Sequence, residues 1–103
     1  MIYHVLYSKV AKEDIKDIYE YIAYDLLEPA TASSQIKRII KLIKSLSEMP
    51  MRFQRYAEEP WYSLGLRVVP VDNYLVFYLP DEMKLTVNII RVMYRGRDLK
   101  TQL

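Results

Sequence analysis

The chain has 103 residues, of which 51% are hydrophobic, 27% charged and 13% aromatic. This composition predicts one domain over residues 1–103 with its own core, and it excludes a disordered or collagen-like chain. The absence of cysteine excludes disulfides and thiolate catalysis, and the single histidine, His4, cannot build a His-rich metal site. We therefore expect no metal and no cofactor. With neither a run of about 18 apolar residues nor a signal peptide, the sequence predicts a cytoplasmic protein.

The net charge of +2 is too small to indicate nucleic-acid binding by itself. Its distribution is uneven, because acidic residues gather within residues 13–28 while residues 91–100 hold four basic residues and one acid. There are only two glycines, Gly65 and Gly96. Because glycine-rich phosphate loops need several glycines close together, such a loop is excluded.

The N-terminal half predicts a strand followed by two helices. Residues 2–7 are rich in β-branched and aromatic types, and Ser8 lies where the N-cap of a helix over 9–26 belongs. A second helix is expected over 31–48, before Pro50. Three lysines, Lys37, Lys41 and Lys44, are expected on its solvated face, as are Asp14, Asp17 and Glu20 on that of the first helix. The apolar stripes predict burial of Ile15, Ile18, Ile22, Ile36, Ile40 and Ile43.

The C-terminal half predicts three strands, over residues 64–69, 74–79 and 86–93, after a structured connection at 50–63. Turn residues separate the strands at short spacing, which is typical of antiparallel hairpins. The element order is therefore β-α-α-β-β-β. We predict an α+β fold in which an antiparallel sheet carries the N-terminal helical hairpin on one face.

Several local strings accompany this order: Ser8-x-x-Ala11-x-x-Asp14-Ile15, Tyr21-Ile22, Leu46-x-x-x-Pro50, Gly65-Leu66-Arg67, Asn73-Tyr74-Leu75-Val76-Phe77-Tyr78, Ile89-Ile90-Arg91-Val92 and Arg95-Gly96-Arg97-Asp98. Together, the order and the strings resemble the RelE/ParE family of bacterial type II toxins. The resemblance implies a growth-inhibiting toxin that is silenced by a cognate antitoxin encoded beside it and that meets operator DNA only through that antitoxin.

The family contains two mechanisms. RelE-like members cleave messenger RNA on the ribosome, whereas ParE-like members poison DNA gyrase with no known hydrolytic site. Tyr74 stands where RelE-like members carry an arginine, Met93 where a related group has histidine, and Thr101 near the place of a terminal tyrosine. These departures favour the ParE-like function and leave ribosome-dependent cleavage as the alternative. A weaker alternative is a degenerate toxin that acts only as a binding partner.

Five residues are candidates for binding the target or a phosphate: Arg67, Arg91, Tyr94, Arg95 and Arg97. Arginine binds phosphate in bidentate fashion but is a poor acid or base, so the set predicts binding and identifies no catalytic residue. The simpler interpretation is a solvated basic face after the last strand. An acidic antitoxin segment is expected to meet these arginines. Tyr74 and Tyr78 are expected on one strand face as amphipathic sheet residues.

Overall fold

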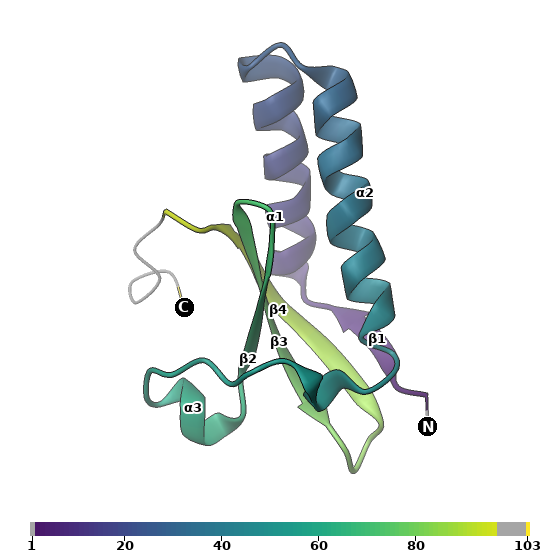
Figure 1. Ribbon diagram of the computed structural model, residues 1–103, viewed down its shortest axis with the longest axis vertical. Helices are drawn as coiled ribbons and strands as arrows, with labels where there is room; N and C mark the ends of the chain where they lie inside the picture. The colour runs from purple at the N-terminus through teal and green to yellow at the C-terminus, as the bar shows by residue number, and fades with distance from the viewer. Residues whose placement is uncertain (1, 97–102) are drawn as a thin grey trace.

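The computed structural model describes residues 2–96 and 103, and it confirms the predicted α+β fold (Figure 1). A helical hairpin lies on one face of a four-stranded sheet with strand order β1-β4-β3-β2. The elements in chain order are β1 (His4–Tyr7), α1 (Lys9–Glu20), η1 (Tyr21–Asp25), α2 (Pro29–Ser45), η2 (Pro50–Arg52), α3 (Trp61–Leu64), β2 (Arg67–Val71), β3 (Tyr74–Asp81) and β4 (Thr86–Tyr94).

The sheet is antiparallel except at its first strand. Strands β2, β3 and β4 form an antiparallel meander with β3 in the middle, so its two outer edges belong to β2 and β4. Strand β1 pairs with that edge of β4 in parallel, from His4 opposite Thr86 to Tyr7 opposite Ile89. The pairing stops there, although β4 continues for five more residues. The outer edge of this part of β4 therefore needs other partners for its backbone.

Ser8 makes the transition from β1 to α1, as predicted. Its Oγ accepts a hydrogen bond from the backbone N–H of Ala11 at 2.9 Å, which caps the helix. The same hydroxyl donates to the carbonyl of Ile90 at 3.0 Å, on the edge of β4 that β1 has just left. One side chain therefore caps the helix and gives a backbone carbonyl of the neighbouring strand its hydrogen-bond donor.

The hairpin differs from the predicted ranges at its tip. The first helix was expected to continue to residue 26, but α1 ends at Glu20 and the chain proceeds through the π-helical turn η1. Leu27 then adopts a left-handed conformation with φ of 57°. The second helix starts at Pro29, two residues early, because proline fits a first helical turn. It ends at Ser45, before the expected residue 48.

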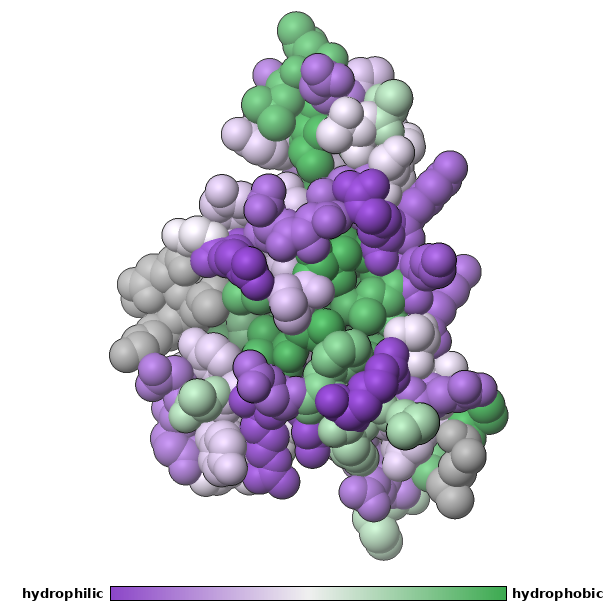
Figure 2. All heavy atoms as spheres, in the orientation of Figure 1, coloured by the Kyte–Doolittle hydropathy of each residue, from purple (hydrophilic) through white to green (hydrophobic). Residues whose placement is uncertain are grey.

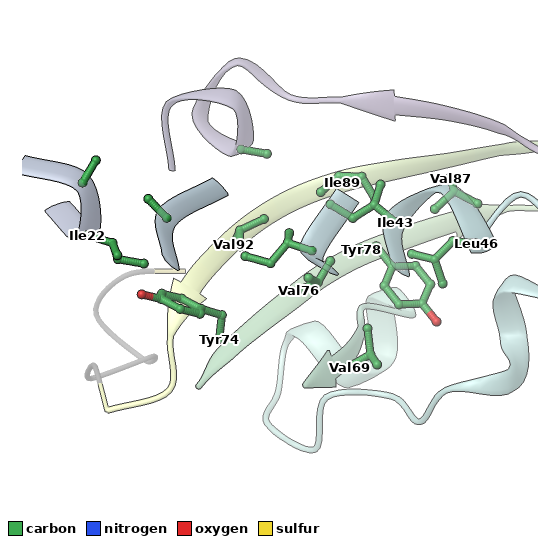
Figure 3. Close-up of a cluster of buried hydrophobic side chains, with 14 residues drawn as sticks. Ile22, Ile43, Leu46, Val69, Tyr74, Val76, Tyr78, Val87, Ile89 and Val92 are labelled. Atoms are coloured by element: carbon green, nitrogen blue, oxygen red, sulfur yellow. The ribbon is translucent and has the colours of Figure 1, made fainter. Parts of the chain in front are cut away.

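The main core lies between the hairpin and the sheet (Figure 3). Ile22 and Ile43 are buried as predicted, whereas the other four isoleucines predicted to be buried are only half-buried. The centre of the α2 stripe is Ile39, which is fully buried, so the prediction for Ile40 was wrong by one helical position. Successive residues of a helix point about 100° apart, which places Ile40 on the shoulder of the buried face.

A smaller cluster lies on the opposite face of the sheet and includes Leu66, Phe77 and Met93. The predicted structured connection covers it. The ring of Tyr56 packs edge-on against Phe77 at 5.4 Å between centroids and against Trp61 at 5.9 Å. Both faces of the sheet are therefore partly covered. In the described part of the chain, no helix has the length and apolar character needed to cross a membrane.

Candidate functional site

The edge of β4 beyond Ile89 is closed by a carboxylate from α1. Asp14, whose accessible surface is 9% of its maximum, accepts hydrogen bonds from Arg91 Nε at 2.7 Å and Nη2 at 3.0 Å. It also accepts one from the backbone N–H of Val92 at 3.0 Å. The hydrogen bond to Asp14 raises the pKa of the Arg91 guanidinium. The expectation that Asp14 lies on the solvated face was wrong, because α1 turns this side chain onto the open strand edge.

Arg67, the first of the five candidates, also has internal partners. Its Nη1 donates to the carbonyls of Met51 at 3.1 Å and Phe53 at 2.6 Å, and so holds the connection against β2. Opposite it in the sheet, the hydroxyl of Tyr78 donates to the carbonyl of Pro50 at 2.7 Å. Burial raises the pKa of Tyr78 to about 12. Arg67 and Arg91 thus make separate, structural sets of contacts and do not form one basic face.

Tyr94 and Arg95 lie together where β4 ends. Tyr94 is 53% exposed, and its ring packs edge-on against that of Tyr74 with centroids 5.9 Å apart. The backbone N–H of Arg95 donates to the carbonyl of Asn73 at 2.8 Å, and the residue is exposed. Arg97 lies outside the described residues, as does Thr101. Of the four candidates within residues 2–96, only the chain neighbours Tyr94 and Arg95 are both exposed at this strand end.

A groove of about 710 Å³ runs beside this strand end, between the hairpin and the adjoining ends of β3 and β4. Its polar lining residues are Asp14, Asp17, Thr31, Gln35 and Asn73. Its apolar and aromatic lining residues are Ile18, Tyr21, Ile22, Leu26, Tyr74, Val92, Met93 and Tyr94. These described lining residues include no lysine, arginine or histidine.

Tyr74 forms part of the wall of this groove, and Figure 3 shows its ring at the start of β3 with Ile22 and Val92 nearby. Burial raises the pKa of Tyr74, and the hydroxyls of Tyr21 and Tyr94 raise it further. Three tyrosines, Tyr21 of η1, Tyr74 of β3 and Tyr94 of β4, therefore line the same groove. Tyr74 and Tyr78 share a strand face, as the sequence predicted, and both are buried.

The far wall of the groove is fixed by polar contacts between α2 and the β2–β3 turn. Gln35, which is 7% exposed, donates from Nε2 to Asp72 at 3.0 Å, and Arg38 Nε donates to the same carboxylate at 2.6 Å. The hydrogen bond from Arg38, followed by that from Gln35, lowers the pKa of Asp72. These bonds join the hairpin to the β2–β3 turn on this side of the groove.

The polar groups of the groove are carboxylates, an amide from each of Gln35 and Asn73, and hydroxyls. Asp14 is engaged by Arg91, and the described lining contains no histidine or lysine. The described residues also hold no cluster of three or more metal-ligating side chains. The groove was not predicted from the sequence, because its lining comes from two segments far apart in the chain, within residues 14–35 and 73–94. The usable signals were the acids of residues 13–28 and the tyrosines at 21 and 74.

The family model described as "ParE toxin of type II toxin-antitoxin system, parDE" matches residues 5–99. The fold is similar to that of a chain from the chromosomal ParDE system of P. aeruginosa, with a TM-score of 0.74 and 18% identity over 90% of this chain and 96% of that one. No match was found among curated proteins.

Two RelE-type structures are also similar. A chain of the toxin-antitoxin complex RelBE2 from Mycobacterium tuberculosis has a TM-score of 0.66 and 21% identity over 92% of this chain and 100% of that one. A mutant of the E. coli toxin RelE in the free state has a TM-score of 0.69 and 14% identity over 99% of this chain and 93% of that one. The TM-scores establish a shared fold, and the low identities leave the choice of target open.

Proposed function

Because this chain belongs to the ParE toxin family of type II toxin-antitoxin systems, we propose that it arrests growth by binding DNA gyrase and that a cognate antitoxin silences it. Gyrase acts in the cytoplasm, so we place the protein there. The activity we propose is binding, with no bond made or broken by the toxin. We propose the groove and the exposed strand end at Tyr94 and Arg95 as the surfaces that meet its partners.

The observation that carries this proposal is the chemistry of the groove. Cleavage of RNA by its own 2′-hydroxyl needs a base, an acid and a stabiliser of the phosphorane charge. The described lining supplies carboxylates and tyrosines but no cation, and Arg91 is already bound by Asp14. A polyanion would meet negative charge there, whereas a protein segment would meet aromatic rings and hydrogen-bonding groups.

Ribosome-dependent RNA cleavage is the second candidate, and one feature favours it. Tyr94 and Arg95 are both exposed at the end of β4, and such a pair can stack on a base and bind a phosphate. The third candidate is a degenerate toxin that acts only as a binding partner. Such a protein should not arrest growth.

The deciding experiment is brief induction of the protein in growing cells with pulse labelling of DNA and of protein. We expect DNA synthesis to stop first, and purified protein to inhibit supercoiling by gyrase in vitro. The control for the second assay is relaxation by a topoisomerase of another class, which should continue. If protein synthesis stops first and ribosome-bound messenger RNA is cut, the ribonuclease function replaces our proposal. Unimpaired growth would leave only the third.

The antitoxin part of the proposal has its own test. The similar structures include a ParDE system from P. aeruginosa and RelE–RelB complexes from M. tuberculosis and Pyrococcus horikoshii OT3. We expect the product of the gene beside this one to co-purify with the toxin and to restore growth when both are expressed. Recovery of a free, non-toxic protein from the native operon would contradict this part.

A further inference from the structure

We propose that the tip of the helical hairpin, residues 24–28, is a second surface by which the toxin binds gyrase. The tip enters a pocket of the enzyme that is apolar at its centre and carries lysine or arginine at its rim. This inference rests on the proposed function, and it adds a contact surface and the chemistry of the pocket that receives it. No residue of the tip is among the five candidates that the sequence predicted.

The tip exposes a continuous stretch of chain that is rich in large apolar side chains. Residues 24–31 are all exposed, and the accessible surface is 65% of its maximum for Tyr24 and 79% for Leu27. Leu26, next to Leu27, is exposed as well. Figure 2 shows hydrophobic spheres gathered at this free end, and Figure 1 shows that the hairpin projects beyond the sheet. Single exposed apolar residues are common, but a cluster at a protruding end indicates an interaction site.

Leu27 occupies a backbone conformation that suits glycine better than leucine. Its φ of 57° lies in the left-handed region, where Cβ crowds the backbone and where helices commonly end on glycine. Two hydrogen bonds fix the turn around it, from the N–H of Leu26 to the carbonyl of Tyr21 and from the N–H of Glu28 to the carbonyl of Ile22, each at 3.0 Å. A largely exposed leucine regains little of this cost by packing within the chain. Such strain is typical of a binding site.

The charges around the tip decide what kind of partner fits it. Residues 17–36 contain four acids, Asp17, Glu20, Asp25 and Glu28, and no lysine, arginine or histidine. Asp25 and Glu28 are exposed on either side of the two leucines in the sequence. This charge repels nucleic acid, and a second copy meeting tip to tip would bring acids against acids. A protein pocket with an apolar centre and a basic rim complements both features of the tip.

The tip and the end of β4 border the same groove, since Leu26 lines it from the hairpin and Tyr94 lines it from the strand. One large partner can therefore contact the tip and Arg95 together. The two contacts have opposite charge, because the tip is acidic and Arg95 is basic. A partner bound at both points is held in a single orientation.

The test measures inhibition of supercoiling by purified gyrase and direct binding of the toxin to gyrase. Leu27→Gly removes the apolar side chain and the strain together, so it should weaken binding about tenfold or more while the melting temperature stays the same or rises. The matched control is Met49→Gly. Met49 is also left-handed, with φ of 48°, and is 73% exposed, but it follows the other end of α2. This control should stay within about twofold of the unsubstituted toxin.

Two further variants separate the parts of the tip. Leu27→Asn keeps a residue that tolerates the left-handed conformation, so it should weaken binding as Leu27→Gly does without loosening the turn. Asp25→Lys with Glu28→Lys should also weaken binding about tenfold or more, because attraction to the rim becomes repulsion. Glu13→Lys with Glu82→Lys makes the same change of charge at exposed positions away from the tip and should stay within about twofold.

Circular dichroism confirms that each variant is folded. Full inhibition of gyrase by folded Leu27→Gly and Leu27→Asn overturns the inference and leaves the proposed function standing. The same holds if these variants lose only self-association, which sedimentation measures, or only binding of the antitoxin, because the tip would then serve that partner. An unsubstituted toxin that does not bind gyrase overturns both the inference and the proposed function.

Discussion

Asp14 and Arg91, 77 positions apart in the sequence, form the ion pair that closes the open edge of β4. Strand β1 pairs with β4 only as far as Ile89, after which Ser8 binds the carbonyl of Ile90 and Asp14 binds the N–H of Val92. Side chains thus replace the missing strand at successive backbone groups. The arrangement protects an edge that could otherwise add a foreign strand, and it fixes the strand end that carries the exposed candidates.

The first prediction is that Asp14→Asn destabilises the protein by about 3 kcal/mol. The change leaves a largely buried guanidinium without its countercharge and weakens the bond to Val92. Urea denaturation followed by circular dichroism measures the free energy of unfolding. Asp17→Asn, on the same helix but exposed, should alter it by less than about 0.5 kcal/mol. Equal effects of the two substitutions would show that the pair does not stabilise the fold.

The second prediction concerns the alkaline limit of stability. The pKa of Tyr78 is about 12 in the folded protein against an ordinary value of 10.0. Between these values the unfolded chain loses the proton and the folded protein keeps it. Stability should therefore fall as the pH rises above 10 and level off near 12. Tyr7 and Tyr74, whose pKa values burial also raises, contribute in the same direction.

Tyr78→Phe should make this alkaline decline shallower while lowering stability at neutral pH by about 1 kcal/mol, because the carbonyl of Pro50 loses its donor. The measurement is the melting temperature between neutral pH and about pH 12. Tyr24→Phe, on the exposed hairpin tip, is the control and should leave the profile unchanged. A Tyr78→Phe profile that matches the unsubstituted protein would refute the assignment.

The third prediction compares two neighbouring core positions. Ile39→Ala should cost about 2–5 kcal/mol, because Ile39 is fully buried between the hairpin and the sheet and its loss leaves a cavity. Ile40→Ala should cost clearly less, since that side chain is only half-buried. Both values come from denaturant unfolding under identical conditions. A larger loss at Ile40 than at Ile39 would mean that α2 packs with a different face.

Local patterns in the sequence were sufficient to predict the fold. Ser8 was identifiable as an N-cap because its type and its place before an apolar stripe are local signals. Side-chain periodicity gave the buried face of α2 to within one position, although it could not decide between Ile39 and Ile40. The parallel pairing of β1 depends on which strand edge is left open. That edge is defined only when β2, β3 and β4, which lie at the other end of the chain, have formed their meander.

The candidate site was harder to predict, because charges pair across long separations in sequence. Arg91 and Arg67 looked like free cations, and only tertiary structure supplies Asp14 for one and the carbonyls of the connection for the other. Asp14 looked solvated for the same reason. The groove draws on the hairpin and on the ends of β3 and β4, so neither half of the chain predicts it alone.

The last prediction separates toxicity from stability at the end of β4. Arg95 is exposed, and its backbone N–H rather than its side chain donates to the carbonyl of Asn73. We expect Arg95→Ala combined with Arg97→Ala to abolish growth arrest while the free energy of unfolding changes by no more than about 0.5 kcal/mol. Lys41→Ala with Lys44→Ala removes the same charge from the solvated face of α2 and should leave the toxin active. Arg91→Ala, by contrast, should lose toxicity together with stability, because it leaves the largely buried Asp14 without its countercharge.

The process that the arginine double variant no longer inhibits also identifies the target. If gyrase is the target, supercoiling in the presence of the variant should return to the level seen without toxin, since a cationic contact to the enzyme is lost. If the ribosome is the target, messenger RNA should remain intact, because the charge developing on the phosphate has lost its partner. A folded double variant that arrests growth as before would exclude this strand end as the toxic site under both mechanisms.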